Sequence, residues 1–428
     1  MTYIKIIFKS LFKRKISSLF IIIQLTITIV MLLSSFIMLN STNYLQDQVK
    51  EKGLDLNKTM KLNIYNPTFT DTFKENYNQL EDYISSIPDI TNFGGFDLTN
   101  AVFEELETND KYIALRKTVI KGTFKEQYST SSEMLMIDKG IYNLLNLKIT
   151  SGRELKENDF YKDEQKITPL LAGENYKDVL KIGEILTRKD NNSKYEIVGF
   201  IDKNSSWFNE QDYISNLLIN LDDKFIIPYN NSEKISNESI LSKSNAIFYV
   251  VNDEDKINYI NNIIETKANS LNIRVKSNTI SEELFNFKKS VNDIVYTNLF
   301  LSIFLIILSC LGISTVMISS ILNRKKEFGI RIATGASMNY IRKLIIGEVS
   351  SLAIISSVIS ILIVFINNLQ SYKFNKYNDI GINPMENISP KCIVFVFLII
   401  MIIVIITTFL PLKRFKKLQT KDLIGGID

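Results

Sequence analysis

The chain has 428 residues, of which 46% are apolar and 22% charged; none is histidine, two are cysteine, and the formal net charge is +4. The absence of histidine excludes a Ser-His-Asp triad, a Cys-His dyad and a cysteine-histidine zinc site within this chain. Four runs contain no Asp, Glu, Lys or Arg: 16–46, 294–323, 349–372 and 392–412. Each is long enough to cross a bilayer as a helix, which takes about 20 residues, so the composition predicts a membrane protein.

The amino-terminal segment, residues 1–15, carries five basic residues and no acidic residue. The apolar run after it is too long for a signal-peptide core. We therefore expect a retained membrane anchor at 16–40, with the amino terminus in the cytoplasm because basic flanks stay on that side. One helical face of segment 1–15 would hold Ile4, Ile7, Phe8 and Leu11. This pattern fits an interfacial helix lying on anionic lipid, although a simple basic flank explains the lysines equally well.

Three further spans are predicted at 294–322, 344–367 and 392–412. They are separated by a cytoplasmic segment, 323–343, and a short outer loop, 368–391, and are followed by a cytoplasmic tail, 413–428. The loop 324–343 has six basic residues against one acid, and the tail has five against two, as the positive-inside rule requires. Residues 40–293 hold 31 Lys+Arg and 40 Asp+Glu, a net charge of 31 − 40 = −9. We therefore predict an extracytoplasmic domain at 41–293.

This large domain shows two segments with the same strand–helix–strand plan. The expected elements are a strand at 61–66, a helix at 73–87 and a strand at 92–96, then a strand at 246–251, a helix at 254–271 and a strand at 272–276. Two such βαβ halves predict a ferredoxin-like α+β layer. Between them we expect a strand-rich insertion at about 99–220, with strands at 113–119, 134–137 and 195–200. The lone tryptophan, Trp207, is interpreted as a packing residue.

The apolar pattern of the first two spans continues into this domain. Leu45 and Val49 extend the first span, and the residues Leu284, Phe287, Val291 and Ile294 recur at helical spacing before the second. The two extensions are expected to pack together as a stalk. The alternative is that they are ordinary amphipathic helix ends.

The cytoplasmic segment 324–337, RKKEFGIRIATGAS, is the most specific local signal in the chain. Glu327 and Arg331 stand four residues apart and can pair on one helical face, and Gly335 can end that helix. Phe328 and Ile332 are expected to offer an apolar anchor for a docked partner. The alternative for the three leading basic residues, 324–326, is that they only fix membrane orientation.

Glu348 stands near the start of the third span, one to two helical turns after the basic pair 342–343. An ionised carboxylate deep in hydrocarbon is costly, so we expect an interfacial ion pair here and do not favour a proton relay.

The segment 324–337 resembles the R-x-x-E-[IF]-G-[IL]-x-x-[AL]-x-G-[AM]-[ST] signature of FtsX-superfamily, MacB-like ABC-transporter permeases. The matching positions are Arg324, Glu327, Phe328, Gly329, Ile330, Arg331, Gly335, Ala336 and Ser337. Similar family patterns occur at 147–155, 181–186 and 195–200 and in the tail 410–426, where Thr420 and Gly425 depart from the family pattern. Glu348 falls where the family commonly has an acid. The third span lacks the glycines that many members carry, and this departure argues against close helix packing there. The resemblance implies four spans with a large α+β extracytoplasmic domain, and a docking role for segment 324–337.

The resemblance also implies partners. No G-x-x-x-x-G-K-[ST] loop occurs in the chain, so a Walker-type nucleotide site is absent from it. We expect no enzyme activity and no cofactor here; ATP and Mg²⁺ would bind a separate ABC ATPase subunit. A second permease copy or paralogue, the lipid bilayer and an extracytoplasmic accessory protein complete the expected partners, and nucleic acid is not among them.

The function implied is a permease of the mechanotransmission type in the cell membrane, for export of, or immunity to, an antimicrobial peptide or antibiotic. One alternative is an FtsX-like regulator that transmits an ATPase cycle to a cell-wall hydrolase. Another is a system that releases lipoproteins or extracts other membrane substrates. A membrane enzyme is disfavoured because no acid/base carboxylate pair stands out.

Overall fold

The computed structural model describes residues 2–65, 71–128, 130–160, 167–208, 218–229, 237–378 and 384–416. The chain divides into two compact units. The helical unit comprises Met1–Tyr44, Lys289–Tyr372 and Pro384–Asp428, and the α+β unit comprises Leu45–Lys288 and Lys373–Asn383. The expected tail motif beyond residue 416 lies outside the described residues.

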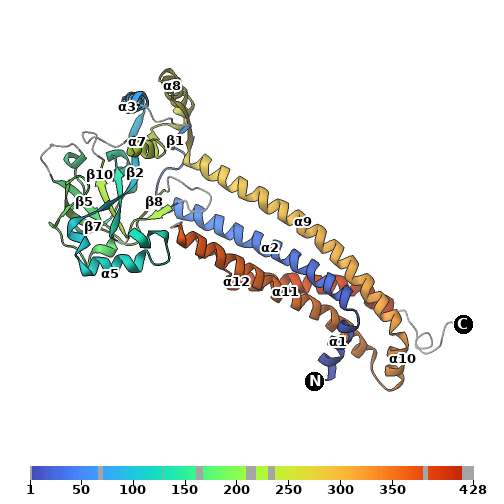
Figure 1. The fold of residues 1–428 in the computed structure, drawn as a ribbon. Helices are drawn as coiled ribbons and strands as arrows, with labels where there is room; N and C mark the ends of the chain where they lie inside the picture. Colours follow the sequence, from blue (N-terminus) through green and yellow to red (C-terminus); the bar gives the residue numbers. More distant parts are fainter. Residues whose placement is uncertain are drawn as a thin grey trace. The chain divides into compact units, whose positions relative to one another are not determined.

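Four long helices provide the helical unit with its candidate membrane spans (Figure 1). They are α2 (Lys15–Lys50), α9 (Ile280–Asn323), α11 (Met338–Tyr377) and α12 (Pro390–Lys416). By length and apolar composition each is sufficient to cross a membrane. Each helix is longer than the span expected from the sequence. The outer loop expected at 368–391 is therefore shorter, because α11 continues to Tyr377.

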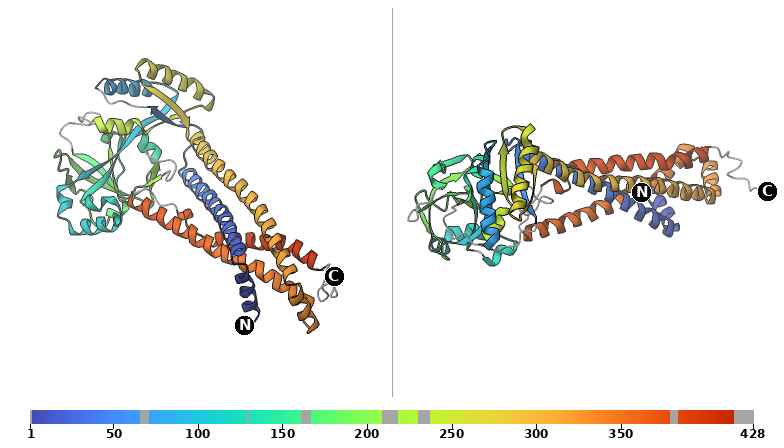
Figure 2. Two further views of the ribbon diagram at one scale, coloured as in Figure 1. Left: turned by 45° about the vertical axis from the view of Figure 1, so that its right-hand side comes forward. Right: turned by 90° about the horizontal axis from the view of Figure 1, so that it is seen from above.

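The helical unit has one apolar core, to which a short amino-terminal helix also contributes. The four long helices run alongside one another in their membrane-length parts (Figure 2). Helix α1 (Thr2–Lys13) buries Ile7 and Leu11 in the same core. A helix thus forms over the expected segment, and these two side chains pack on protein. Phe8, expected on the same face, is exposed.

Helices α2 and α11 pack closely, contrary to the expectation drawn from the scarcity of glycine. The hydroxyl of Ser360 lies 3.1 Å from the carbonyl oxygen of Thr26, and that of Ser356 lies 3.3 Å from the carbonyl oxygen of Ile22. Both serines are fully buried. Serine, like glycine, is small enough to let two helix backbones approach.

The first part of the α+β unit is a ferredoxin-like layer, as predicted. Its strands are β1 (Thr59–Tyr65), β2 (Ile90–Val102), β11 (Ile247–Val251) and β12 (Arg274–Thr279). Their order is β12-β1-β11-β2, with neighbouring strands antiparallel. Helices α3 (Asp71–Ser85) and α8 (Ile257–Ser270) lie beside each other and bury apolar faces against the sheet (Figure 1). This is the arrangement that two split βαβ units produce.

Strand β2 joins this layer to the insertion because it is long enough to belong to both. Its residues Ile90–Gly95 pair with β11, and Phe96–Val102 pair with β3 (Ser131–Ile137). The sheet then continues through the strands β10 (Lys224–Pro228), β5 (Thr168–Ala172), β7 (Lys194–Ile201) and β4 (Ile149–Gly152), with β6 (Ile185–Thr187) also on β7. The strands expected at 134–137 and 195–200 are confirmed. The insertion extends beyond 220, since β10 belongs to its sheet.

The strand expected at 113–119 is wrong, because this segment is part of helix α5 (Asp110–Val119). The β-branched residues of this segment favoured a strand, but a helix cap just before the segment favours a helix. The Asn109 side chain accepts a hydrogen bond from the backbone N–H of Tyr112 at 3.1 Å, a normal helix cap. Tyr112 and Arg116, four residues apart, are the buried face of the helix.

Further described elements of the insertion are short. Among them are the helices α4 (Glu104–Glu107), α6 (Lys139–Leu145) and α7 (Asn237–Ser244), three 3-10 helices (Phe124–Tyr128, Glu157–Phe160 and Glu174–Tyr176), and the strand pair β8 (Ser206–Phe208) and β9 (Leu218–Asn220). Trp207 in β8 is 1% exposed and stacks edge-on against Phe96, Phe208 and Phe248. Its expected role as a packing residue is confirmed.

The two helix extensions expected to form a stalk contact each other inside the α+β unit. Leu45, Val49 and Leu284 are buried, and the Gln46 side-chain nitrogen lies 3.4 Å from the Leu284 carbonyl oxygen. Ile294 does not continue this face, since it is 50% exposed and its neighbour Val295 is buried. Three helical turns take about eleven residues, so the face that contains Leu284 reaches position 295.

Candidate functional site

The candidate site begins at the junction of α9 with a short helix, α10 (Lys325–Ala333). Gly335, with φ of +98°, ends α10. The backbone N–H of Ala336 donates to the carbonyl of Arg331 at 2.8 Å, and that of Gly335 to the carbonyl of Ile332 at 3.0 Å. These two bonds form a Schellman motif, which confirms the expected helix end. The Ser337 hydroxyl then accepts the backbone N–H of Tyr340 at 3.2 Å and caps α11.

Glu327 forms the predicted pair with Arg331, at 2.9 Å. It is also bound on its other side by Arg324, whose Nε lies 3.1 Å from Glu327 Oε2. The hydrogen bond from Arg324 is the main reason that the pKa of the Glu327 carboxyl lies below its ordinary value, and Arg331 adds to the effect. Glu327 is therefore an anion held between two guanidinium groups.

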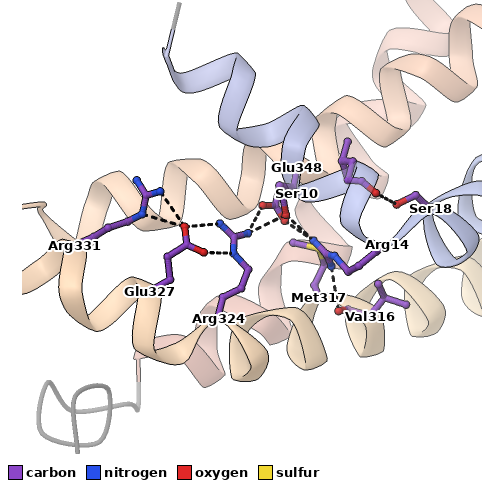
Figure 3. A network of polar contacts seen from close by, with 10 residues as sticks. Ser10, Arg14, Ser18, Val316, Met317, Arg324, Glu327, Arg331 and Glu348 are labelled. Carbon is purple, nitrogen blue, oxygen red and sulfur yellow. Dashed lines mark hydrogen bonds and ion pairs between the residues drawn. The ribbon is translucent and has the colours of Figure 1, made fainter.

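Glu348 is the centre of the network that Figure 3 shows. Although it is only 1% exposed, its two oxygens each meet an arginine, Arg324 at 2.6 Å and Arg14 at 2.8 Å. The Ser10 hydroxyl lies 3.1 Å from Arg14 Nη2 and 2.9 Å from Arg324 Nη1. A buried carboxylate is tolerated when it is paired and hydrogen-bonded in this way. The expected ion pair is confirmed, with partners that the sequence did not identify.

Arg324 is the link between the two carboxylates, and its place corrects the view that it only fixes membrane orientation. Its guanidinium contacts Glu327 of α10 and Glu348 of α11 at once, and a planar fork of donors suits such bridging. Three arginines and two glutamates form a chain from Arg331 through Glu327, Arg324 and Glu348 to Arg14 (Figure 3). The chain ties together α1, α10 and α11.

Phe328 is not the docking anchor that the sequence predicted. It is 1% exposed in the core of the helical unit, and the Arg324 guanidinium carbon lies 4.8 Å from the centre of its ring. Gly329 is also buried, and Ile332 packs partly against the same core. The exposed face of α10 instead carries Lys326, Ile330 and Thr334.

The nine signature residues thus have two different positions. Arg324, Glu327, Phe328, Gly329 and Arg331 form the ionic chain or the core beneath it. The other members, Ile330, Gly335, Ala336 and Ser337, lie on the outer face of α10 or in the turn that follows it. Sequence reasoning missed Arg14 and Ser10. A signal was present, because Arg14 is the only arginine among the five basic residues of segment 1–15, and arginine is preferred over lysine in buried pairs.

A second buried ionic cluster lies in the α+β unit. Lys243 of α7 is 3% exposed and lies between Glu81 at 3.0 Å and Asp138 at 2.9 Å. Its Nζ stands 4.5 Å from the centre of the Tyr229 ring. Burial acts to lower the pKa of Lys243, but the two carboxylates outweigh it and raise the pKa above its ordinary value. Burial has the opposite effect on a carboxyl group, and it raises the pKa of Glu81. Glu81 accepts a hydrogen bond from the Tyr77 hydroxyl at 2.7 Å.

This second cluster depends on two glycines of β2. A Cβ atom on Gly94 would lie 2.8 Å from the Cβ of Asp138, and one on Gly95 would lie 2.8 Å from the Cγ of Lys243. The backbone N–H of Gly95 also donates to Asp138 Oδ2 at 2.8 Å. Asp138 and Lys243 therefore require a strand without side chains at this point.

Part of the helical unit matches a known protein family. Residues 299–420 match the family described as FtsX-like permease C-terminal. The chain therefore carries an FtsX-like permease domain, and the resemblance to FtsX-superfamily permeases inferred from the sequence is confirmed over this segment.

Two solved structures resemble part of the chain. The periplasmic region of MacB from Actinobacillus actinomycetemcomitans is 12% identical, with a TM-score of 0.35, over 54% of this chain and 92% of that one. The extracellular domain of the noncanonic ABC-type transporter YknZ from Gram-positive bacteria is 14% identical, with a TM-score of 0.30, over 51% of this chain and 99% of that one. No curated protein sequence matches the chain.

Proposed function

We propose that this chain is the permease subunit of a MacB-like ABC transporter, driven by ATP hydrolysis in a separate ATPase subunit. The observation that supports this most is the position of Arg324, which bridges a carboxylate of α10 and one of α11. A force applied to α10 would reach α11 and α1 through this ionic chain. The FtsX-like permease match supports the same class of function.

The ATPase would dock on the exposed face of α10. Lys326, Ile330 and Thr334 recur every four residues and share one side of the helix. Ile330 is 63% exposed, and an exposed aliphatic residue beside a lysine is a suitable centre for a protein contact. This face replaces the anchor that the sequence placed at Phe328.

Co-purification with an ABC ATPase tests the docking. The full chain is tagged and co-expressed with the ABC ATPases of its own cell, and bound ATPase is measured by mass spectrometry. Ile330→Asp is expected to remove the ATPase. The matched control is Ile182→Asp, which changes an isoleucine of the α+β unit that is 50% exposed. Failure of every ABC ATPase to co-purify with the unmodified chain would contradict the proposal.

Transmission would follow the helices that run between the units. α2 and α9 are each unbroken across the boundary between the helical unit and the α+β unit. Two permease copies would then move their extracytoplasmic domains together, without a polar pore for the substrate. In this mechanism the termini and α10 are cytoplasmic, as the basic flanks predict.

The substrate class proposed is an antimicrobial peptide or antibiotic, and this part rests on the family resemblance alone. Cells without the chain are expected to become more susceptible to such compounds, and the unmodified chain is expected to restore resistance. Restoration of cell-wall hydrolase activity, with no change in susceptibility, would favour the FtsX-like regulator instead.

A further inference from the structure

Helix α1 has three distinct sides, and only one of them contacts protein. The inward side contributes Ile7 and Leu11 to the apolar core. The same side contributes Ser10, and Arg14 in the turn after the helix, to the ionic network. Ile6 packs partly against the same core, whereas five other described side chains of α1 are exposed. They form two separate rows, one aromatic and one basic.

The aromatic row consists of Phe8 and Phe12, which are 42% and 66% exposed. They lie one helical turn apart and so on the same side of α1. Large apolar side chains at this exposure are unfavourable in water and favourable at the boundary of headgroups and acyl chains. The uncharged run of α2 begins at residue 16, so this row lies beside the start of a candidate span.

The basic row consists of Lys5, Lys9 and Lys13, all exposed. Successive lysines are four residues apart, which is about 6 Å along the helix. Among the ion pairs formed by the described part of the chain, none involves these three lysines. The sequence also has no Asp or Glu before Asp47. The row is thus a line of positive charge with no counter-charge near it in the sequence.

We propose that anionic phospholipid headgroups bind the basic row of α1 while Phe8 and Phe12 insert among the acyl chains, and that this binding holds Arg14 on Glu348. Charge complementarity selects an anionic lipid over a zwitterionic one. The adjacent aromatic row selects a bilayer over a soluble anion. Because Ser10 and Arg14 belong to the same twelve-residue helix and the turn after it, a lipid-bound α1 fixes one side of the ionic network. The proposal does not depend on docking of an ATPase.

Lipid selectivity of the full chain tests the binding step. The protein is placed in nanodiscs of phosphatidylcholine that contain a small fraction of spin-labelled phosphatidylglycerol or phosphatidylcholine. The immobilised fraction of each label gives the relative association constant. Lys5→Gln, Lys9→Gln and Lys13→Gln combined should lower the preference for phosphatidylglycerol, by about five-fold for each lysine that contacts a headgroup.

The matched control replaces three exposed lysines of the α+β unit, Lys111, Lys117 and Lys121, by glutamine. The control removes the same charge and should retain the full preference. An unchanged preference in the α1 triple variant would overturn the proposal. So would a triple variant that loses a bound ATPase but keeps its lipid preference, because the row would then be a protein-docking surface.

Two further measurements test the orientation and the coupling to Arg14. In a Phe12→Trp variant, additional fluorescence beyond that of Trp207 should be quenched by brominated acyl chains, and absence of quenching would contradict insertion. Phosphatidylglycerol should also slow amide hydrogen exchange of α10 in the unmodified chain, because Arg324 and Glu348 join α10 to Arg14. Arg14→Gln should abolish this protection while keeping the lipid preference. Protection that persists without Arg14 would overturn the coupling.

Discussion

The two buried ionic clusters are opposite in charge and different in extent. In the helical unit a carboxylate, Glu348, lies between two arginines, whereas in the α+β unit an ammonium group, Lys243, lies between two carboxylates. The first cluster continues through Glu327 to Arg331, which is 31% exposed in its side chain. The second is enclosed by Tyr77 and Tyr229. A chain that reaches the surface can respond to a bound partner, and an enclosed cluster can only hold its elements together.

The largest effect is expected from Lys243→Met, which tests the enclosed cluster. It leaves Glu81 and Asp138 buried without their cation, and removing one partner of a buried pair costs about 3–5 kcal/mol. Denaturant unfolding is followed by the fluorescence of Trp207, the lone tryptophan, which is buried in the same unit. The control is Lys256→Met, whose lysine pairs with Asp89 at 2.7 Å on the surface. Equal stability of the two variants would remove the distinction between a buried and a surface pair.

Glu348→Gln tests the centre of the other cluster and is expected to have the next largest effect. The amide keeps the shape but leaves two arginines without a counter-charge, and a hydrogen bond to a charged group is worth about 1.5–3 kcal/mol. Amide hydrogen exchange of α1, which Ser10 and Arg14 join to this cluster, should accelerate about ten-fold or more. Glu51→Gln, which changes an exposed glutamate just after α2, serves as the control. An exchange rate of α1 equal to that of the unmodified chain would show that the charge of Glu348 is dispensable.

Arg324→Lys addresses the bridge specifically. A lysine keeps the charge but does not span Glu327 and Glu348 with a rigid fork. The free energy of local opening of α10 should therefore fall by about 1 kcal/mol. Amide hydrogen exchange of α10 measures this effect. Arg14 pairs with Glu348 and not with Glu327 in the described structure. Arg14→Lys should therefore change the amide exchange of α10 less. Equal exchange in the two variants would mean that Arg324 has no special bridging role.

The smallest effect is expected from a change of pH, and it concerns Glu327, near the exposed end of the ionic network. Because the folded-state pKa of Glu327 is below the ordinary value, its stabilisation is present above the ordinary glutamate range and is lost as the pH falls through the lowered pKa. The thermal midpoint in nanodiscs at pH 6 and pH 3.5 should therefore differ more for the unmodified chain than for Glu327→Gln. An identical pH response would assign the difference to other acids.

Long regular patterns were predictable from the sequence, and side-chain contacts between distant segments were not. Four spans and two βαβ halves followed from uncharged length and helical or strand periodicity, since each pattern is local. The bridge between Arg14 and Glu348 joins residues 334 positions apart, and no local pattern specifies it. Phe328 was misassigned because a short helix with one buried side has the same spacing whether that side meets its own bundle or a partner. At 113–119, β-branched residues concealed a helix that its Asn109 cap defines.

The separation of Arg14 from Glu348 also determines when the pair can form during synthesis. Arg14 leaves the ribosome long before Glu348, which follows only after residues 45–288 of the α+β unit and the second long helix have been made. Arg14 is therefore without this partner while that part of the chain is translated. Glu348 enters the lipid with the third long helix, where an unpaired carboxylate is costly. Closure of this pair is thus a late event in biogenesis.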